Sequence, residues 1–329
     1  MSLKARKSGR SGKTKGSETN IADTTQITLP LQRTTRKHKL EEEVEDDKPQ
    51  KKPSTKRANT RGSQDYFMAR YAEDQYHQVP NFRVNDTEGL VYPVEVNKNF
   101  IRPTEWAKIK KPGIWPNGAP WPPTQTSDLT MAYSREAVCA NCRAHPRDVD
   151  CGCEIEEWQE HQAVTWRDNF ELREIPDMGV GVFALKDVDA RVVVGELAGL
   201  LRPSTHKASG SAKHYECKLE IGPYQDVKQQ PYAYIDVWKY GSWTRFINHS
   251  CEPNTEFLEA RVGRTRLLTC ETTQKIKAGR QVTVDYGEGF FESDNKCRCG
   301  TKSCDNPYQE GDSADEEEEM DSADEEDEM

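Results

Sequence analysis

The chain has 329 residues, of which 34% are hydrophobic and 31% are charged, with a mean hydropathy of -0.93. Such a polar composition excludes a chain that is globular from end to end, and the absence of any run of about 18 apolar residues excludes a membrane-spanning helix. The net charge of -10 hides an asymmetry, because residues 1–61 hold 16 Lys and Arg against 8 Asp and Glu, whereas residues 312–329 hold 12 acidic residues and no basic one.

Residues 1–65 form a basic arm rich in Lys, Arg, Ser and Thr with almost no apolar periodicity, which predicts disorder. The cluster KKPSTKR contains Lys51, Lys52, Lys56 and Arg57 and fits a nuclear import signal. The start of the chain lacks the apolar core of a secretory signal. We therefore expect an intracellular, nuclear protein without a membrane segment, whose basic arm makes weak contact with nucleic acid.

Residues 66–135 form a loop-rich flanking segment that contains several aromatic side chains. The run WPNGAPWPP at residues 115–123 excludes a helix and a central strand, because proline lacks the backbone donor that both structures need. We predict that this segment lies over the domain that follows and that its Trp and Tyr side chains supply contact area.

Residues 136–164 hold four closely spaced cysteines, Cys139, Cys142, Cys151 and Cys153. In a reducing compartment, such cysteines serve as metal ligands or free thiols more often than as disulfides. Their spacing suits one tetrahedral zinc ion. The alternative is a reducible or only partly liganded loop.

Residues 165–290 alternate short stretches typical of β-strands with Asp, Gly and Pro. Strands are predicted at residues 168–174, 180–185, 192–201, 215–222, 232–237, 254–262, 265–273 and 281–287, with one or two helical turns at 238–247. Many short strands with little helix predict a mainly β body of several small curled sheets. A Rossmann fold is disfavoured, because the strands do not alternate with long amphipathic helices.

Residues 291–308 hold Cys297, Cys299 and Cys304 in a segment too short for a hydrophobic core. A structural zinc ion needs four ligands, and Cys251 is the candidate for the fourth. Four unrelated free thiols are the alternative. Residues 309–329 repeat the motif DSADEE and predict a disordered acidic tail, which either engages a basic partner or is a solvated spacer.

Three motifs follow one another within 60 residues: RFINHSCEPN at 245–254, VDYGEGF at 284–290 and CRCGTKSC at 297–304. Together they resemble the SET-domain family of protein lysine methyltransferases, nearest to its heterochromatin-type members, over residues 165–305. The resemblance implies a SET-domain fold with a pseudo-knotted active site, flanked by zinc-binding cysteine segments, the second of them the family's post-SET cluster. It also implies methyl transfer from S-adenosylmethionine to a lysine ε-amine of a histone tail, with H3 favoured. A non-histone substrate and a catalytically silent chromatin scaffold are the alternatives.

The resemblance also implies roles for individual residues. Tyr286 is the implied catalytic tyrosine, whose neutral phenol orients the incoming amine, and Tyr215 is a second tyrosine of the lysine channel. The implied cofactor-binding residues are Gly179, Val180, Gly181, Arg245, Asn248, His249 and Tyr286. The alternative for Asn248 and His249 is a structural pair in a turn, and for Tyr286 it is a core tyrosine.

The chain departs from the family pattern at three places. Val180 stands where many members have Trp, Arg or Tyr, which still allows a backbone contact. Val284 stands where many heterochromatin-type members have Phe or Tyr. Its smaller side chain suggests room for a higher methylation state unless another residue fills that space, so the methylation state stays open. The quartet Cys139, Cys142, Cys151 and Cys153 replaces a larger cysteine cluster, so we expect a reduced version with one zinc ion.

In the basic arm, Ala5, Arg6, Lys7 and Ser8 reproduce the local context of lysines on the histone H3 tail. Lys7 is therefore a candidate for automethylation, or for a mimic that occupies the substrate groove. The alternative is a chance match in a segment rich in Lys and Arg.

Overall fold

The structure, a computed structural model, describes residues 66–81, 89–131, 137–145, 151–176, 178–223, 230–287, 290–291, 296–304 and 306–309. The predictions for the basic arm, including its import signal and Lys7, lie outside the described residues, as do those for the acidic tail from residue 310 onward. Among the described helices, none is long and apolar enough to cross a membrane.

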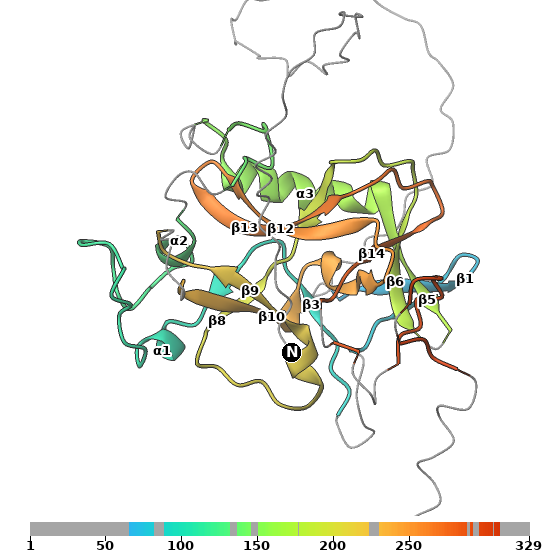
Figure 1. Cartoon of the computed structure of the whole chain (residues 1–329), viewed down its shortest axis with the longest axis horizontal. Helices are drawn as coiled ribbons and strands as arrows, with labels where there is room; N and C mark the ends of the chain where they lie inside the picture. The colour runs from blue at the N-terminus through green and yellow to red at the C-terminus, as the bar shows by residue number, and fades with distance from the viewer. Residues whose placement is uncertain are drawn as a thin grey trace, which may run out of the picture. The chain divides into compact units, whose positions relative to one another are not determined.

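The larger of two sheets joins strands from the flanking segment, the central region and the end of the folded body (Figure 1). Its order is β2 (Gln75–Gln78), β1 (Met68–Ala72), β5 (Phe170–Ile175), β6 (Gly179–Ala184), β14 (Gln281–Val284), β12 (Thr255–Val262), β13 (Thr265–Thr272) and β7 (Val193–Glu196), and β11 (Asn248–His249) also pairs with β14. Strands β5 and β6 form an antiparallel pair, as do β12 and β13, whereas β14 runs parallel to both β11 and β12.

The smaller sheet has β10 at its centre. Its order is β3 (Val94–Glu95), β10 (Tyr232–Gly241), β8 (Gly199–Pro203) and β4 (Phe100–Ile101), and β9 (Glu216–Glu220) pairs with β10 as well. Strands β3 and β4 belong to the flanking segment and pair in parallel with β10 and β8. The mainly β body of small sheets predicted from the sequence is confirmed.

In the part of the chain that the structure describes, helices are few and mostly short. They are α1 (Pro103–Trp106), α2 (Ser127–Thr130), α3 (Ile155–Asn169) and the two 3-10 helices η1 (Gly210–Tyr215) and η2 (Trp243–Phe246). The sequence did not predict the 15-residue helix α3, which begins inside the first cysteine segment (residues 136–164) and ends at Asn169. Glu156 and Glu157 in its first turn and Arg167 in its last turn complement the helix dipole, and its buried face carries Trp158 and Trp166.

The prediction of helical turns over residues 238–247 was partly wrong. Strand β10 continues through Gly241, and helical structure is confined to η2. The reason is tertiary: Tyr240 and Gly241 pair with Val94 and Glu95 of β3, so the flanking segment supplies the partner that keeps this stretch extended.

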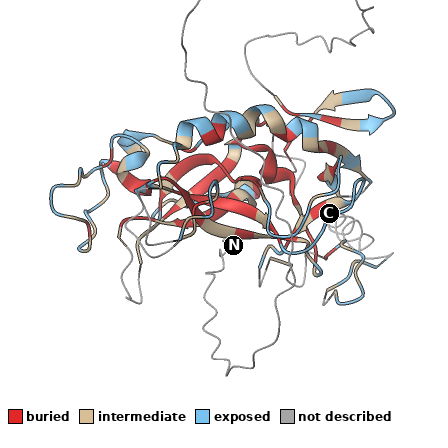
Figure 2. Cartoon of the chain, turned by 90° about the horizontal axis from the view of Figure 1, so that it is seen from above, coloured by how far each residue is buried: buried red, intermediate tan, exposed pale blue. Residues whose placement is uncertain are grey.

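Tryptophans of the flanking segment are buried against the body. Trp106 is 1% exposed, and its Nε1 donates to the carbonyl oxygen of Leu201 in β8 at 3.2 Å. Trp115 and Trp121 pack edge to face. Figure 2 shows that the buried residues gather in the strands next to α3, with exposed residues along the outer side of that helix. Trp106 and Trp115 therefore supply contact area against the body, whereas Tyr71, Tyr76 and Tyr92 are exposed, so the expectation that tyrosines do the same was wrong for these three.

Candidate functional site

The predicted site residues come together where β11 lies beside β14. The 3-10 helix η2 leads into β11, in which Asn248 pairs with Thr283 and His249 with Val284 of β14. Tyr286 follows β14 by two residues. The pairing therefore places the segment 247–249 next to Tyr286, although the two are almost 40 residues apart in the chain.

The glycine pair in β6 allows a close approach of the Asn248 side chain. Nδ2 of Asn248 donates to the carbonyl oxygen of Val180 at 3.2 Å. A Cβ added to Gly181 would lie 2.6 Å from Cδ1 of Ile175 and 3.0 Å from Nδ2 of Asn248, so a larger residue there would force these side chains to move. Gly179 has a φ of +73°, in the left-handed region that glycine adopts without strain.

Arg245 is buried on η2 and lies close to Tyr215. Its guanidinium carbon is 4.7 Å from the ring centre of Tyr215, and its Nε donates to the carbonyl oxygen of Val237 at 2.8 Å. Burial lowers the pKa of Arg245 to about 10, against the opposing effect of the nearby phenols of Tyr215 and Tyr286. Arg245 therefore remains a cation at neutral pH and lies near both predicted tyrosines.

Asn81 belongs to this site and could not be found from the sequence. It is 4% exposed, its Oδ1 accepts from Nη2 of Arg245 at 2.5 Å, and its Nδ2 donates to the carbonyl oxygen of Trp238 at 2.5 Å. The ring of Trp238 is in turn 5.0 Å from that of Tyr215. No motif surrounds Asn81, and its partners are 157 and 164 positions away in the chain.

The phenol of Tyr286 is held in one orientation. Its hydroxyl donates to the carbonyl oxygen of Ile247 at 3.0 Å, and its ring packs edge to face on Phe290 at 4.6 Å between centres. Burial raises the pKa of Tyr286 well above its usual value, and the nearby phenol of Tyr215 adds to this effect. Because the hydroxyl proton points to Ile247, the lone pairs of a neutral phenol remain available as acceptors.

His249 contacts Tyr286 on one side and a cysteine on the other. The backbone N–H of Tyr286 donates to Nδ1 of His249 at 3.1 Å, and Nε2 lies 3.3 Å from Sγ of Cys251. Burial lowers the pKa of His249, although the carboxylate of Asp285 opposes this shift. The imidazole is therefore neutral near pH 7.

The second cysteine quartet adjoins this site. The sulfur atoms of Cys251, Cys297, Cys299 and Cys304 all lie within 4.8 Å of one another, and those of Cys251 and Cys297 are 4.0 Å apart. Burial raises the pKa of Cys251 to about 11. Burial would also raise the pKa of Cys299, but hydrogen bonds from Thr301 and from the Cys251 backbone lower it to about 6. Four cysteine sulfur atoms at this distance are a donor set that fits a tetrahedral zinc ion.

The first quartet is attached to β12. The sulfur atoms of Cys139, Cys142, Cys151 and Cys153 also lie within 4.8 Å of one another. Arg261 is 1% exposed and its Nη1 lies 3.4 Å from Sγ of Cys151. Burial would raise the pKa of Cys151, but hydrogen bonds from the Cys153 backbone and from Arg261 lower it to about 6. The buried guanidinium therefore favours a thiolate here, and this donor set fits zinc as well.

A third group, formed by His206, Glu216 and Asp236, has a different character. Their ligand atoms also lie within 4.8 Å of one another. Nε of Arg202 donates to Oδ2 of Asp236 at 2.5 Å, so a fixed cation already balances that carboxylate. Burial, assisted by the charge of Asp236, raises the pKa of Glu216 to about 7. We interpret this group as an ion-pair network and not as a metal site.

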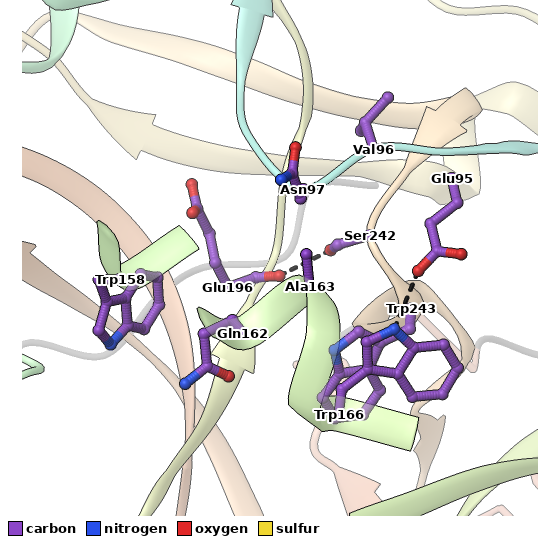
Figure 3. Close-up of a pocket in the computed structure, with 10 residues that line it drawn as sticks. All are labelled: Glu95, Val96, Asn97, Trp158, Gln162, Ala163, Trp166, Glu196, Ser242 and Trp243. Atoms are coloured by element: carbon purple, nitrogen blue, oxygen red, sulfur yellow. Dashed lines mark hydrogen bonds between the residues drawn. The ribbon is translucent and has the colours of Figure 1, made fainter. Parts of the chain in front are cut away.

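A hollow lies between α3, β7 and the loop after β3, away from the site residues described above, and Figure 3 shows its lining. Trp158, Trp166 and Trp243 form its aromatic walls, and Glu196 lies at one side. The Trp166 and Trp243 rings stack at 5.3 Å, and Nε1 of Trp166 donates to Glu95. None of the residues that line this hollow belongs to the predicted site, and two of its carboxyl groups, those of Glu95 and Glu196, accept hydrogen bonds from side chains of α3.

The chain is similar to known proteins over the region that holds these residues. Residues 179–287 match the family model of the SET domain. The chain is similar to histone-lysine N-methyltransferase EHMT1 of Mus musculus, with 33% identity over 145 residues that cover 42% of this chain and 11% of that protein. It is similar to histone-lysine N-methyltransferase 2B of Homo sapiens, with 31% identity over 128 residues that cover 38% and 5%. The chain thus spans only a small part of the length of these relatives.

Solved structures also match, among them the following two. One is KRYPTONITE in complex with mCHH DNA, an H3(1-15) peptide and SAH, with 23% identity, a TM-score of 0.32, and coverage of 42% of this chain and 29% of that one. The other is the methyltransferase domain of human histone-lysine N-methyltransferase SETMAR, with 21% identity, a TM-score of 0.34, and coverage of 42% and 56%. These TM-scores are too low for a comparison of site geometries.

Proposed function

We propose that this chain, which carries a SET domain and is related to histone-lysine N-methyltransferases, transfers a methyl group from S-adenosylmethionine to the ε-amine of a protein lysine. The observation that carries the proposal is the convergence of Asn248, His249 and Tyr286 beside the glycine pair of β6. These are the residues that the family resemblance implies for cofactor and substrate.

The protein forms no covalent bond with either reactant in this reaction. The cofactor supplies a methyl group on a sulfonium; the free amine of lysine attacks that carbon, the carbon–sulfur bond breaks, and the new ammonium loses a proton to water. Alignment of the amine with the methyl–sulfur bond supplies much of the acceleration. The chain must therefore hold both partners in line, present oxygen acceptors and exclude water.

Tyr286 has the geometry for this positioning. Its hydroxyl proton is engaged by the carbonyl oxygen of Ile247, which leaves the oxygen free to accept weak CH contacts from the methyl group and to orient the amine. Its raised pKa keeps the phenol neutral throughout the working pH range. Tyr215 is proposed as the opposite wall of the lysine channel, since Arg245 lies against its ring.

The glycine pair and β11 are proposed to bind the cofactor. Gly179, Val180 and Gly181 expose backbone that can approach the methionine portion, and Arg245, Asn248 and His249 line the adenine side through backbone groups. Each cysteine quartet is proposed to hold one structural zinc ion. Because Cys251 belongs to the second quartet, that zinc would tie residues 297–304 to the strand that carries His249.

The substrate is proposed to be a histone tail, with H3 favoured, and the location to be nuclear chromatin. The relatives are named for histone lysines, and the basic arm adds an import signal and a surface for weak contact with nucleic acid. A non-histone substrate is the second candidate. Val284 is buried and smaller than the aromatic residue of many members, which favours more than one methyl group per lysine.

The test is methyl transfer from labelled cofactor to full-length core histones and to tail peptides. We expect transfer to one histone and a loss of at least about 10²-fold in kcat for Tyr286→Phe, because one positioned oxygen is removed from the transition state. Tyr240→Phe is the matched control, since that ring packs on Phe100 in the smaller sheet. Mass spectrometry of the same samples reports any methylation of Lys7.

Transfer to a non-histone protein alone would move the substrate to the second candidate. Cofactor binding without transfer to any protein would leave a catalytically silent scaffold, and equal rates for Tyr286→Phe and the intact chain would contradict the role of Tyr286.

A further inference from the structure

The His249 side chain spans the gap between the second cysteine quartet and Tyr286. It is 9% exposed, with Nε2 3.3 Å from Sγ of Cys251 and Nδ1 3.1 Å from the backbone nitrogen of Tyr286. The backbone N–H is a donor only, so Nδ1 must be the acceptor. In a neutral imidazole the proton then resides on Nε2 and points to the sulfur.

Tyr286 is held at both ends by the same short segment. Its hydroxyl donates to the carbonyl oxygen of Ile247, and its backbone N–H donates to His249 two residues later. The ring of Phe291 packs on the imidazole with centres 4.7 Å apart and limits its movement. Any rotation of the His249 ring therefore breaks a hydrogen bond that fixes the backbone of Tyr286.

We propose that His249 is a positioning residue that couples the metal-binding state of the Cys251 quartet to the orientation of Tyr286. A metal-bound thiolate is an anionic acceptor, so the Nε2–H bond to Cys251 is strong when the quartet is loaded. That bond sets the ring so that Nδ1 faces the N–H of Tyr286. When the metal leaves, the Cys251 sulfur is no longer held in the quartet, the ring loses this anchor, and the backbone of Tyr286 loses its partner.

This inference deepens the proposed function, because it concerns the residue assigned there to substrate alignment. Its physical basis is the general one for groups around a metal: hydrogen bonds to the ligands orient them and change metal affinity by about 10- to 100-fold. Here the hydrogen bond between His249 and Cys251 also has an effect outside the metal site, because it fixes the imidazole that accepts from the backbone N–H of Tyr286.

Two substitutions of His249 test separately its hydrogen bonds to Cys251 and to the backbone of Tyr286. In His249→Asn, the side-chain oxygen can occupy the place of Nδ1 and accept from Tyr286, whereas the bond to Cys251 is lost. In His249→Gln, the amide nitrogen can occupy the place of Nε2 and donate to Cys251, whereas the acceptor for Tyr286 is lost. His161→Gln is the matched control, because His161 is exposed on α3.

The measurement uses the full-length, zinc-loaded chain with 3-fluorotyrosine at position 286 and follows its ¹⁹F resonance while a chelator removes zinc. For the wild type and the control, we expect the resonance to move as zinc leaves the second quartet. For His249→Gln, we expect it to be displaced already while two zinc ions per chain are retained. For His249→Asn, we expect about 10-fold faster zinc release and a normal resonance until zinc is lost.

The proposal is overturned if the wild-type resonance does not respond to zinc removal, or if His249→Gln shows the wild-type resonance and the wild-type response. Circular dichroism of each variant verifies that it is folded. Neither the fluorine signal nor the zinc content depends on methyl transfer. A chain that shows the coupling but methylates nothing would therefore contradict the proposed function and leave this inference standing.

Discussion

Gly181 is the residue at which the candidate site is most tightly packed. A methyl group there would lie 2.6 Å from Cδ1 of Ile175, 2.7 Å from Nε2 of Gln281 and 3.0 Å from Nδ2 of Asn248. Ile175 lies in β5, the neighbour of β6, and the Asn248 side chain reaches from β11 to β6. A single methyl group would therefore disturb both the sheet and the proposed cofactor contact.

We expect Gly181→Ala to lower the free energy of unfolding by about 1–3 kcal/mol, as overpacking does, and to weaken cofactor binding. Thermal unfolding and calorimetric titration with S-adenosylmethionine measure the two effects. Gly113→Ala is the control, since a Cβ at Gly113 meets no atom within 4 Å. Full cofactor affinity in Gly181→Ala would show that the backbone of β6 does not approach the cofactor.

At the scale of elements, α3 is fixed to the body by a buried carboxyl group. Glu196 of β7 is 6% exposed, its Oε1 accepts from Nδ2 of Asn99 at 2.9 Å, and its Oε2 is 2.8 Å from Nε2 of Gln159 on α3. Burial raises the pKa of Glu196 to about 8, in spite of the hydrogen bond from Gln159. The carboxyl group is therefore neutral in the folded protein at pH 7.

The raised pKa of Glu196 makes the folded protein less stable as the pH rises. Below pH 4.5 Glu196 is protonated in both states; between pH 4.5 and about 8 only the unfolded state ionises, so the contribution of Glu196 to folding is lost as the pH rises. Relative to wild type, we expect Glu196→Gln to gain on the order of 2–4 kcal/mol between pH 5 and pH 9.

Urea unfolding at the two pH values measures the gain of Glu196→Gln. Val164→Ala, at a position 75% exposed on α3, is the control and adds no titrating group. A difference between Glu196→Gln and wild type that is the same at both pH values would mean that Glu196 is not neutral in the folded state.

On the scale of the whole molecule, one cysteine quartet precedes residues 179–287, which match the SET-domain model, and the other joins Cys251 within that region to three cysteines that follow it. The first is attached to β12 through Arg261, whose guanidinium also donates to the carbonyl oxygens of Ala137 and His145. The second connects β11 to residues 297–304, where Ser303 donates to Glu252. Neither segment has a large core of its own, so we expect metal binding to stabilise the conformation of each.

We expect the purified chain to contain two zinc ions and Cys153→Ser to contain one, with a lower unfolding temperature, because three thiols bind zinc less tightly than four. Elemental analysis and thermal unfolding measure both effects. Cys217→Ala is the control: Cys217 is 1% exposed in the core and belongs to neither quartet, so zinc content should remain at two. Equal zinc in Cys153→Ser and wild type would contradict a metal in the first quartet.

The sequence by itself determined the resemblance to the SET-domain family, the mainly β body and the two sets of cysteines, because these depend on local information: motif order, short alternating stretches and close spacing of thiols. The resemblance to the SET domain is confirmed over residues 179–287. The structure brings Tyr286, Tyr215 and the predicted cofactor residues close together, and their roles stay predictions.

Only the tertiary structure decided the long-range contacts. Asn81 reaches Arg245 across 164 residues, β3 keeps β10 extended through Gly241, and His249 turns its ring between Cys251 and Tyr286. Sequence patterns describe which residues share a face of one element, whereas these contacts depend on which elements become neighbours. A buried polar group is satisfied by whatever donor or acceptor the folded chain places beside it, and that partner leaves no mark in the local sequence.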